Sequence, residues 1–213
     1  MSHFDRLASQ VYVGIRDGDL DPEAAFDLAC LLMDAGQSGE AVRQLAEQSV
    51  DGTDPARLAD TAGQVLEESG FEPDFDTEPR LLEALELALE AVREDAQATA
   101  LGSEVGLSFM GRRDLRATFA HFRGSFSWTS GIRPGEGRDR VSALVAVADD
   151  VQDAVVGQLM SAWPVCPAHR FGGHPREHGH QAVWWCTGDG GHVIAPIGHW
   201  DGSVSRPRRP TRS

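Results

Sequence analysis

The chain has 213 residues, of which 41% are hydrophobic, and its formal net charge is −14. This composition, with nine Phe and five Trp, is typical of a folded protein and excludes a generally disordered chain. No apolar run approaches the roughly 18 residues that span a bilayer, and residues 1–6 do not resemble a signal peptide. We therefore expect a cytoplasmic protein without membrane association, whose three cysteines are free thiols or metal ligands.

Acidic residues are concentrated in the first half of the chain. Residues 1–100 contain 23 Asp and Glu against 6 Arg, whereas residues 101–213 contain 10 against 13. This asymmetry predicts a domain boundary and an acidic binding surface. All 19 basic residues are arginines, which codon usage in a GC-rich bacterial genome explains.

Residues 1–98 are predicted to form an acidic bundle of five short helices. The first helix, over 3–17, repeats apolar residues at helical spacing. The later helices begin at signals that cap a helix or place proline in its first turn, namely Asp21-Pro22, Ser38-Gly39, Asp54-Pro55 and Thr77-Glu78-Pro79. Because the loops between these helices are brief, we expect antiparallel packing.

The fifth predicted helix has a strongly acidic face. Its inward face is formed by Leu82, Leu85, Leu89 and Val92. Its outward face is formed by Glu83, Glu86, Glu90 and Glu94. Such a run is usually the solvated side of an amphipathic helix. The functional interpretation is a docking surface for a basic protein, because the net charge of −17 over residues 1–100 attracts a basic partner and repels nucleic acid.

Residues 99–202 are predicted to form a small mixed α/β domain. Strands are expected over 103–110, 117–123 and 141–147. The Gly- and Arg-rich residues 124–139 predict a loop. The sequence Asp149-Asp-Val-Gln152 resembles a capping box and predicts a helix that ends near Met160.

A hairpin close to residue types that bind metals ends this domain. Residues 180–186 and 192–197 are expected to pair, with a turn at a Gly-Asp-Gly-Gly sequence. Cys166 and His169 precede the hairpin at the Cys-x2-His spacing of a metal knuckle, and Cys186 follows after a gap of zinc-ribbon size. The fourth ligand is left open between His192, across the turn, and Asp189, a less usual ligand for structural zinc. These ligands suit Zn²⁺, so we expect structural zinc in a zinc-ribbon-like hairpin.

Two other interpretations compete with structural zinc. The cysteines could pack beneath the neighbouring tryptophans without any metal. Alternatively, three ligands (Cys166, His169 and Cys186) could leave an open position for an activated water, as in a metal-dependent hydrolase. The sequence contains no His-Glu-x-x-His helix and no evident general base. Enzyme activity therefore ranks below a binding function.

Two further groups of residues have less specific patterns. His174, His178 and His180 lie among Gly and Pro, which is typical of an exposed histidine-rich loop. Arginines are frequent after residue 110 but are not interleaved with aromatic residues in a recognisable pattern. A nucleic-acid accessory role therefore ranks below the other two functions.

Four C-terminal segments occur in an order that resembles a set of uncharacterised actinobacterial proteins. They are Val147 to Val155, Trp163-Pro-Val-Cys-Pro-Ala-His169, Ala182-Val-Trp-Trp-Cys186 and Val193-Ile-Ala-Pro-Ile-Gly198. The resemblance implies a helix, a Trp-Pro-x-Cys-Pro-x-His knuckle and a closing strand pair, and it implies no activity. The N-terminal half is similar in style to small acidic helical proteins that neutralise bacterial toxins.

Together these features predict an α+β fold. An all-α bundle over 1–98 precedes a small mixed α/β domain over 99–202, and a basic tail over 203–213 is expected to be disordered. The expected function is that of a non-enzymatic binding protein, an immunity-like or accessory factor, whose acidic helical face engages a basic protein.

Overall fold

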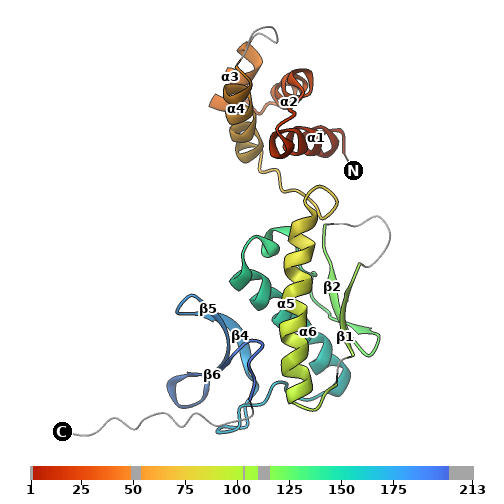
Figure 1. The fold of residues 1–213 in the computed structure, drawn as a ribbon, viewed down its shortest axis with the longest axis vertical. Coiled ribbons are helices and arrows are strands. Elements are labelled where there is room, and N and C mark those ends of the chain that lie inside the picture. The colour runs from red at the N-terminus through yellow and green to blue at the C-terminus, as the bar shows by residue number, and fades with distance from the viewer. Residues whose placement is uncertain (1, 49–53, 103, 110–115, 202–213) are drawn as a thin grey trace, which may run out of the picture. The chain divides into compact units, whose positions relative to one another are not determined.

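The computed structural model describes residues 2–48, 54–102, 104–109 and 116–201 (Figure 1). These residues form an α+β fold with six α-helices and two three-stranded antiparallel sheets. The chain divides into two compact units, Met1–Thr77 and Glu78–Ser213. Within the described ranges, no helix has the length and apolar character needed to cross a membrane.

The described residues of the first unit form four helices. These are α1 (His3–Asp17), α2 (Pro22–Asp34), α3 (Glu40–Glu47) and α4 (Pro55–Glu68). The predicted start signals act as expected, since the side chains of Asp21 and Asp54 accept hydrogen bonds from backbone N–H groups in the first turns of α2 and α4. Fully buried residues such as Leu28, Val42 and Val65 form one apolar core among the four helices.

The second unit is built around a pair of packed helices, α5 (Pro79–Ala98) and α6 (Arg140–Leu159). One sheet has the order β1-β2-β3, with β1 (Val105–Ser108), β2 (Phe119–Phe122) and β3 (Ser125–Phe126). The other has the order β4-β5-β6, with β4 (His174–His178), β5 (Gln181–Cys186) and β6 (His192–Pro196). Both sheets contact α6, and Figure 1 shows them on opposite sides of the helix pair. Two short 3₁₀ turns, η1 (Pro134–Gly137) and η2 (Gly188–Gly190), complete the unit.

The five helices expected in the first half of the chain are all present, but α5 belongs to the second unit. It packs mainly against α6, η1 and β1. The boundary between the compact units therefore follows Thr77, whereas the sequence placed it near residue 98. An amphipathic pattern shows that a helix has an apolar face, but it does not show which element covers that face.

The expected strand over 141–147 is wrong, because these residues form the first half of α6. Asp139 caps the start of the helix, because its side chain accepts hydrogen bonds from the backbone N–H groups of Val141 and Ser142 at 2.9 Å. Buried residues recur at helical spacing along the whole helix, from Ala143 to Val155. The predicted capping box therefore lies inside the helix, and Asp150 is a buried side chain rather than part of a cap.

Smaller differences concern the strands. The expected strands 103–110 and 117–123 correspond to the shorter β1 and β2, and the expected loop 124–139 contains β3 and η1. The expected C-terminal strand pair is present as β5 and β6, and β4 adds a third strand that the sequence did not predict. The tail 203–213 lies outside the described residues.

Candidate metal centre

A tight turn brings Cys166 and His169 together after α6. Backbone bonds join Cys166 N–H to the Phe171 carbonyl at 2.8 Å and Arg170 N–H to the Cys166 carbonyl at 2.9 Å. Arg170 has a φ of 61°, and Val165 bridges to Gly172 beyond it. The chain therefore reverses direction within a few residues, and the His169 side chain returns to the Cys166 sulfur.

The other two candidate ligands come from the hairpin. Cys186 is the last residue of β5 and His192 is the first residue of β6, and the two are paired across the strands. The 3₁₀ turn η2 connects them. Since both side chains are placed by a paired register, the hairpin presents them as a fixed set to the Cys166–His169 turn.

The four predicted metal ligands form one cluster, and their ligand atoms all lie within 4.8 Å of one another. His169 Nδ1 lies 3.7 Å from Cys166 Sγ and 3.5 Å from Cys186 Sγ, and His192 Nε2 lies 3.5 Å from Cys166 Sγ. Both cysteines are buried and both are free thiols. This Cys2His2 group could hold a metal ion, as the sequence predicted.

Two contacts from η2 support the cluster. Asp189 accepts a hydrogen bond from His169 Nε2 at 2.9 Å, which leaves Nδ1 directed at the sulfurs. Gly188 N–H donates to Cys186 Sγ at 3.3 Å. A side chain at Gly188 would meet the His169 ring, since a Cβ there would lie 2.5 Å from Cγ. The absence of a side chain at this position therefore allows the imidazole to reach the cluster.

The surroundings of the cluster shift its pKa values in different directions. Burial raises the pKa of Cys166, but backbone N–H groups of His169 and Ala168 and the His169 ring outweigh it and bring the pKa to about 7. The pKa of Cys186 is raised, chiefly by burial. The pKa of His169 is raised by the hydrogen bond to Asp189 and by Cys166. At neutral pH the Cys166 thiol is therefore partly ionised, and the thiolate is the form that binds metals.

A buried carboxylate anchors the neighbouring sheet to α5. Asp95 Oδ2 accepts from Trp184 Nε1 at 2.7 Å and from Gly198 N–H at 2.8 Å, and Oδ1 accepts from Trp200 N–H at 2.8 Å. Burial raises the pKa of Asp95, and the three hydrogen bonds act in the opposite direction. Trp184 also packs edge-on against Trp163, with ring centroids 5.3 Å apart. Trp184, one of the tryptophans that could have covered metal-free cysteines, therefore has a polar partner of its own.

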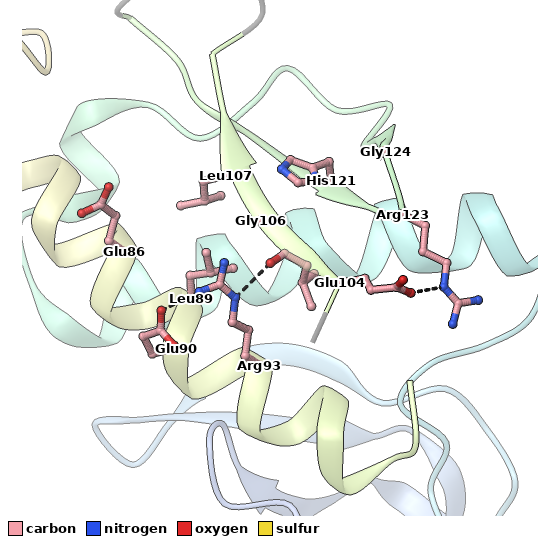
Figure 2. A pocket seen from close by; sticks show the side chains of 11 residues that line it. Glu86, Leu89, Glu90, Arg93, Glu104, Gly106, Leu107, His121, Arg123 and Gly124 are labelled. Atoms are coloured by element: carbon pink, nitrogen blue, oxygen red, sulfur yellow. Dashed lines mark hydrogen bonds and ion pairs between the residues drawn. The ribbon is translucent and has the colours of Figure 1, made fainter. Parts of the chain in front are cut away.

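The predicted acidic face lies on α5, and all four of its glutamates are exposed. Glu90 pairs with Arg93 at 2.5 Å, and Arg93 Nε also donates to the Val105 carbonyl on β1. Figure 2 shows Glu86 and Glu90 beside a cavity of about 640 Å³ between α5 and β1. These glutamates are not part of the Cys/His cluster, so the chain carries two separate candidate sites.

The sequence pattern predicted no role for Asp95 and placed Asp150 in a capping box. Asp150 accepts from the backbone N–H of Ala120 at 2.6 Å and from the Thr129 hydroxyl, and so joins α6 to β2. A signal for Asp95 exists, since it follows Val92 by three residues and therefore lies on the apolar side of α5. A carboxylate at such a position indicates a buried acceptor.

Comparisons of the chain with protein-family models, with curated proteins and with solved structures found no match.

Proposed function

We propose that this chain is a non-enzymatic, cytoplasmic protein-binding protein, an immunity-like or accessory factor. In this proposal a structural Zn²⁺ ion bound by Cys166, His169, Cys186 and His192 holds the β4–β6 sheet in shape, and the acidic face of α5 engages a basic partner. The observation that carries the proposal is the fourfold ligand cluster, because four protein ligands leave no position for a reacting water.

The distances within the cluster support a tetrahedral ion. Zn–S bonds of about 2.3 Å and Zn–N bonds of about 2.0–2.1 Å place sulfur and nitrogen ligands about 3.6 Å apart. Three of the four sulfur–nitrogen distances here are 3.5, 3.5 and 3.7 Å, and all four ligand atoms lie within 4.8 Å of one another. The ligand types also favour zinc over Mg²⁺ or Ca²⁺, which prefer oxygen.

The contacts around the ligands are those that a structural site needs. Asp189 on His169 corresponds to the carboxylate that orients a metal-bound imidazole, and the Gly188 N–H stabilises a thiolate at Cys186. The ligands connect the turn after α6 to both strands of the hairpin. A bound ion would therefore link the turn after α6 to the hairpin, and its binding free energy would add to the stability of the fold.

The alternative function, a metal-dependent hydrolase using Cys166, His169 and Cys186, is less well supported. It requires an open coordination position, which His192 would fill. The nearby carboxylate of Asp189 accepts from His169 and so serves to orient a ligand. Neither feature favours activation of a water molecule.

The binding part of the proposal rests on α5. Its glutamates at 83, 86, 90 and 94 repeat along one side of the helix, and all are exposed. Carboxylates held on a rigid helix attract and orient a basic partner with little entropic cost to the surface.

The test is affinity capture with a charge-reversed surface. The triple variant Glu83→Arg, Glu86→Arg, Glu90→Arg should lose a basic partner that the unchanged chain retains at low salt. A matched control, Asp27→Arg, Asp60→Arg, Glu67→Arg, reverses three exposed charges in the first unit and should retain it. Equal capture by both variants would contradict a docking role for α5, and zinc-dependent hydrolysis abolished by Cys166→Ala in a folded chain would favour the alternative.

A further inference from the structure

A second surface of the second unit exposes large apolar side chains. Trp128 is 89% exposed and Met160 is 87% exposed, and Val156 on the same side of α6 is 37% exposed. Trp128 lies over α6 at Gly157, where a Cβ would come within 3.5 Å of the indole ring. Its backbone N–H donates to Asp153 at 2.5 Å, which fixes its place beside the helix. Contiguous exposed apolar groups of this kind mark interaction surfaces.

A cavity of about 610 Å³ adjoins this surface. Its apolar lining includes Val156, Met160 and Trp163, while Asp149 and Asp153 supply carboxylates. Burial raises the pKa of Asp149, and the charges of Asp150 and Asp153 raise it further. The cavity therefore combines an aromatic and apolar wall with carboxylates that repel one another, and a cationic group placed beside them would relieve that repulsion.

The chain itself contains a segment of matching chemistry. Residues 202–213, outside the described part of the chain, have the sequence Gly-Ser-Val-Ser-Arg-Pro-Arg-Arg-Pro-Thr-Arg-Ser, with four arginines and a Pro-x-x-Pro spacing. Proline-rich segments bind grooves lined by aromatic residues. Arginine pairs with carboxylates and stacks on tryptophan.

The start of this segment is held close to the cavity. Trp200 N–H is bonded to Asp95 at 2.8 Å, and Thr99, one turn further along α5, accepts from Nε1 of Trp163 at 2.8 Å. Asp95 and Thr99 are about 6 Å apart along the helix axis at 1.5 Å per residue. Twelve residues in an extended, proline-rich conformation span about 37 Å. The segment can therefore reach the cavity, one wall of which is Trp163.

We infer that the cavity beside Trp128 and Met160 binds the chain's own segment 202–213, with its prolines against the apolar wall and its arginines toward Asp149 and Asp153. This contact is independent of the proposed function, because it uses neither the glutamates of α5 nor the Cys/His cluster. It covers the largest exposed aromatic side chain of the described residues.

Fluorescence quenching of the full-length chain by acrylamide tests this inference. Trp128 is the only one of the five tryptophans that is fully exposed in the absence of such a contact, since the others are buried or half-buried. A neutral quencher also avoids effects of the tail's charge. Trp128 should be protected in the unchanged chain, and quenching should rise severalfold in a variant with Pro207→Ala and Pro210→Ala and with the four tail arginines changed to Ser. In a Trp128→Phe background this difference should disappear.

Two measurements separate the other outcomes. Equal quenching of the unchanged chain and the tail variant would overturn the inference. Loss of Trp128 protection on changing Glu83, Glu86 and Glu90 to Gln would place the tail on α5 and would also overturn it. The molar mass in solution should be that of a monomer. A dimer that dissociates in the tail variant would show that the occupant comes from a second copy, which also overturns the inference.

Discussion

Different interactions stabilise the interior of each of the two units of this chain. In the first unit, the buried side chains of the described residues are apolar apart from Thr61 and Thr77. The second unit buries two carboxylates, Asp95 and Asp150, and two thiols that form a cluster with two half-buried imidazoles. One unit therefore depends on hydrophobic burial, and the other depends in addition on polar groups that need specific partners.

This difference should determine how the stability of each unit responds to pH, chelators and reductants. An apolar core tolerates changes of pH, chelators and reductants, because its contacts are not directional and involve no titrating group. Buried polar groups stabilise a fold only while every partner is in place, and the loss of one partner leaves the others unsatisfied. We therefore expect the second unit to respond to perturbations that leave the first unit unchanged.

The largest effect should come from removal of the metal or of one of its ligands. Cys166→Ala, or a strong chelator, should unfold the β4–β6 sheet, because structural Zn²⁺ contributes about 10 kcal/mol or more to small sites. Hydrogen exchange resolved along the chain should show that the amides of β4–β6 lose protection and that those of α1–α4 keep it. Cys30→Ala, a thiol removed from the first unit, is the matched control and should leave both patterns unchanged. Protection of β4–β6 that survives chelation would contradict a structural metal.

Asp95→Ala should be the next most damaging change. It would leave three donors without their acceptor, namely Trp184 Nε1 and the backbone N–H groups of Gly198 and Trp200, at a cost of about 3 kcal/mol or more. Denaturant unfolding of the second unit gives this value. The neighbouring Glu94→Ala removes an exposed carboxylate and should change the free energy of unfolding by less than about 0.5 kcal/mol. Equal effects of the two substitutions would show that Asp95 is not an anchor.

Asp189→Ala should weaken metal binding without unfolding the chain. Loss of a carboxylate that orients a metal-bound histidine typically lowers metal affinity about 10- to 100-fold. Competition with a chelator of known affinity measures the change. Glu177→Ala, an exposed carboxylate on β4, should leave the affinity unaltered. If Asp189→Ala retains full affinity, the contact to His169 Nε2 plays no part in the site.

Metal affinity should also rise with pH across the neutral range. The pKa of Cys166 is lowered to about 7 and that of Cys186 is raised by burial, so a metal must displace a proton from Cys186 at neutral pH and from both thiols below about pH 7. For each proton that the metal must displace, the metal affinity falls about tenfold for every unit by which the pH is lowered. Affinities measured at about pH 6 and about pH 8 by the same competition assay check the sign. An affinity that does not change with pH would argue against thiolate ligands.

The smallest effect concerns the first unit. Asp21→Ala removes the side-chain cap of α2 and should lower the free energy of unfolding of that unit by about 1 kcal/mol. Thermal unfolding should show the same decrease with and without chelator. A decrease that depends on chelator would mean that the two units are not energetically separate.

The Cys/His cluster could be predicted from the sequence because each of its two halves is local. Cys166 and His169 are three residues apart, and Cys186 and His192 flank one turn, so spacing alone indicated their grouping. The role of Asp189 could not be predicted in the same way. Its contact with His169 depends on the conformation of η2, in which Asp189 has a φ of 50°.

The fold was predicted less completely for two physical reasons. Residues 141–147 are rich in valine and alanine, and over so short a run a buried strand and a buried helix have similar patterns; the helical period becomes clear only when the run is extended to residue 159. The unit to which α5 belongs depends on long-range packing against α6, which no local pattern encodes. Helix starts at Asp21 and Asp54, by contrast, were correct because caps act within one turn.

X-ray absorption at the zinc edge, on the full-length chain purified without chelator, tests the central claim most directly. A closed structural site predicts one zinc per chain with two sulfur ligands at about 2.3 Å and two nitrogen ligands at about 2.0–2.1 Å. A chain without stoichiometric zinc, or a zinc ion with an oxygen ligand in place of one of the four side chains, would contradict it.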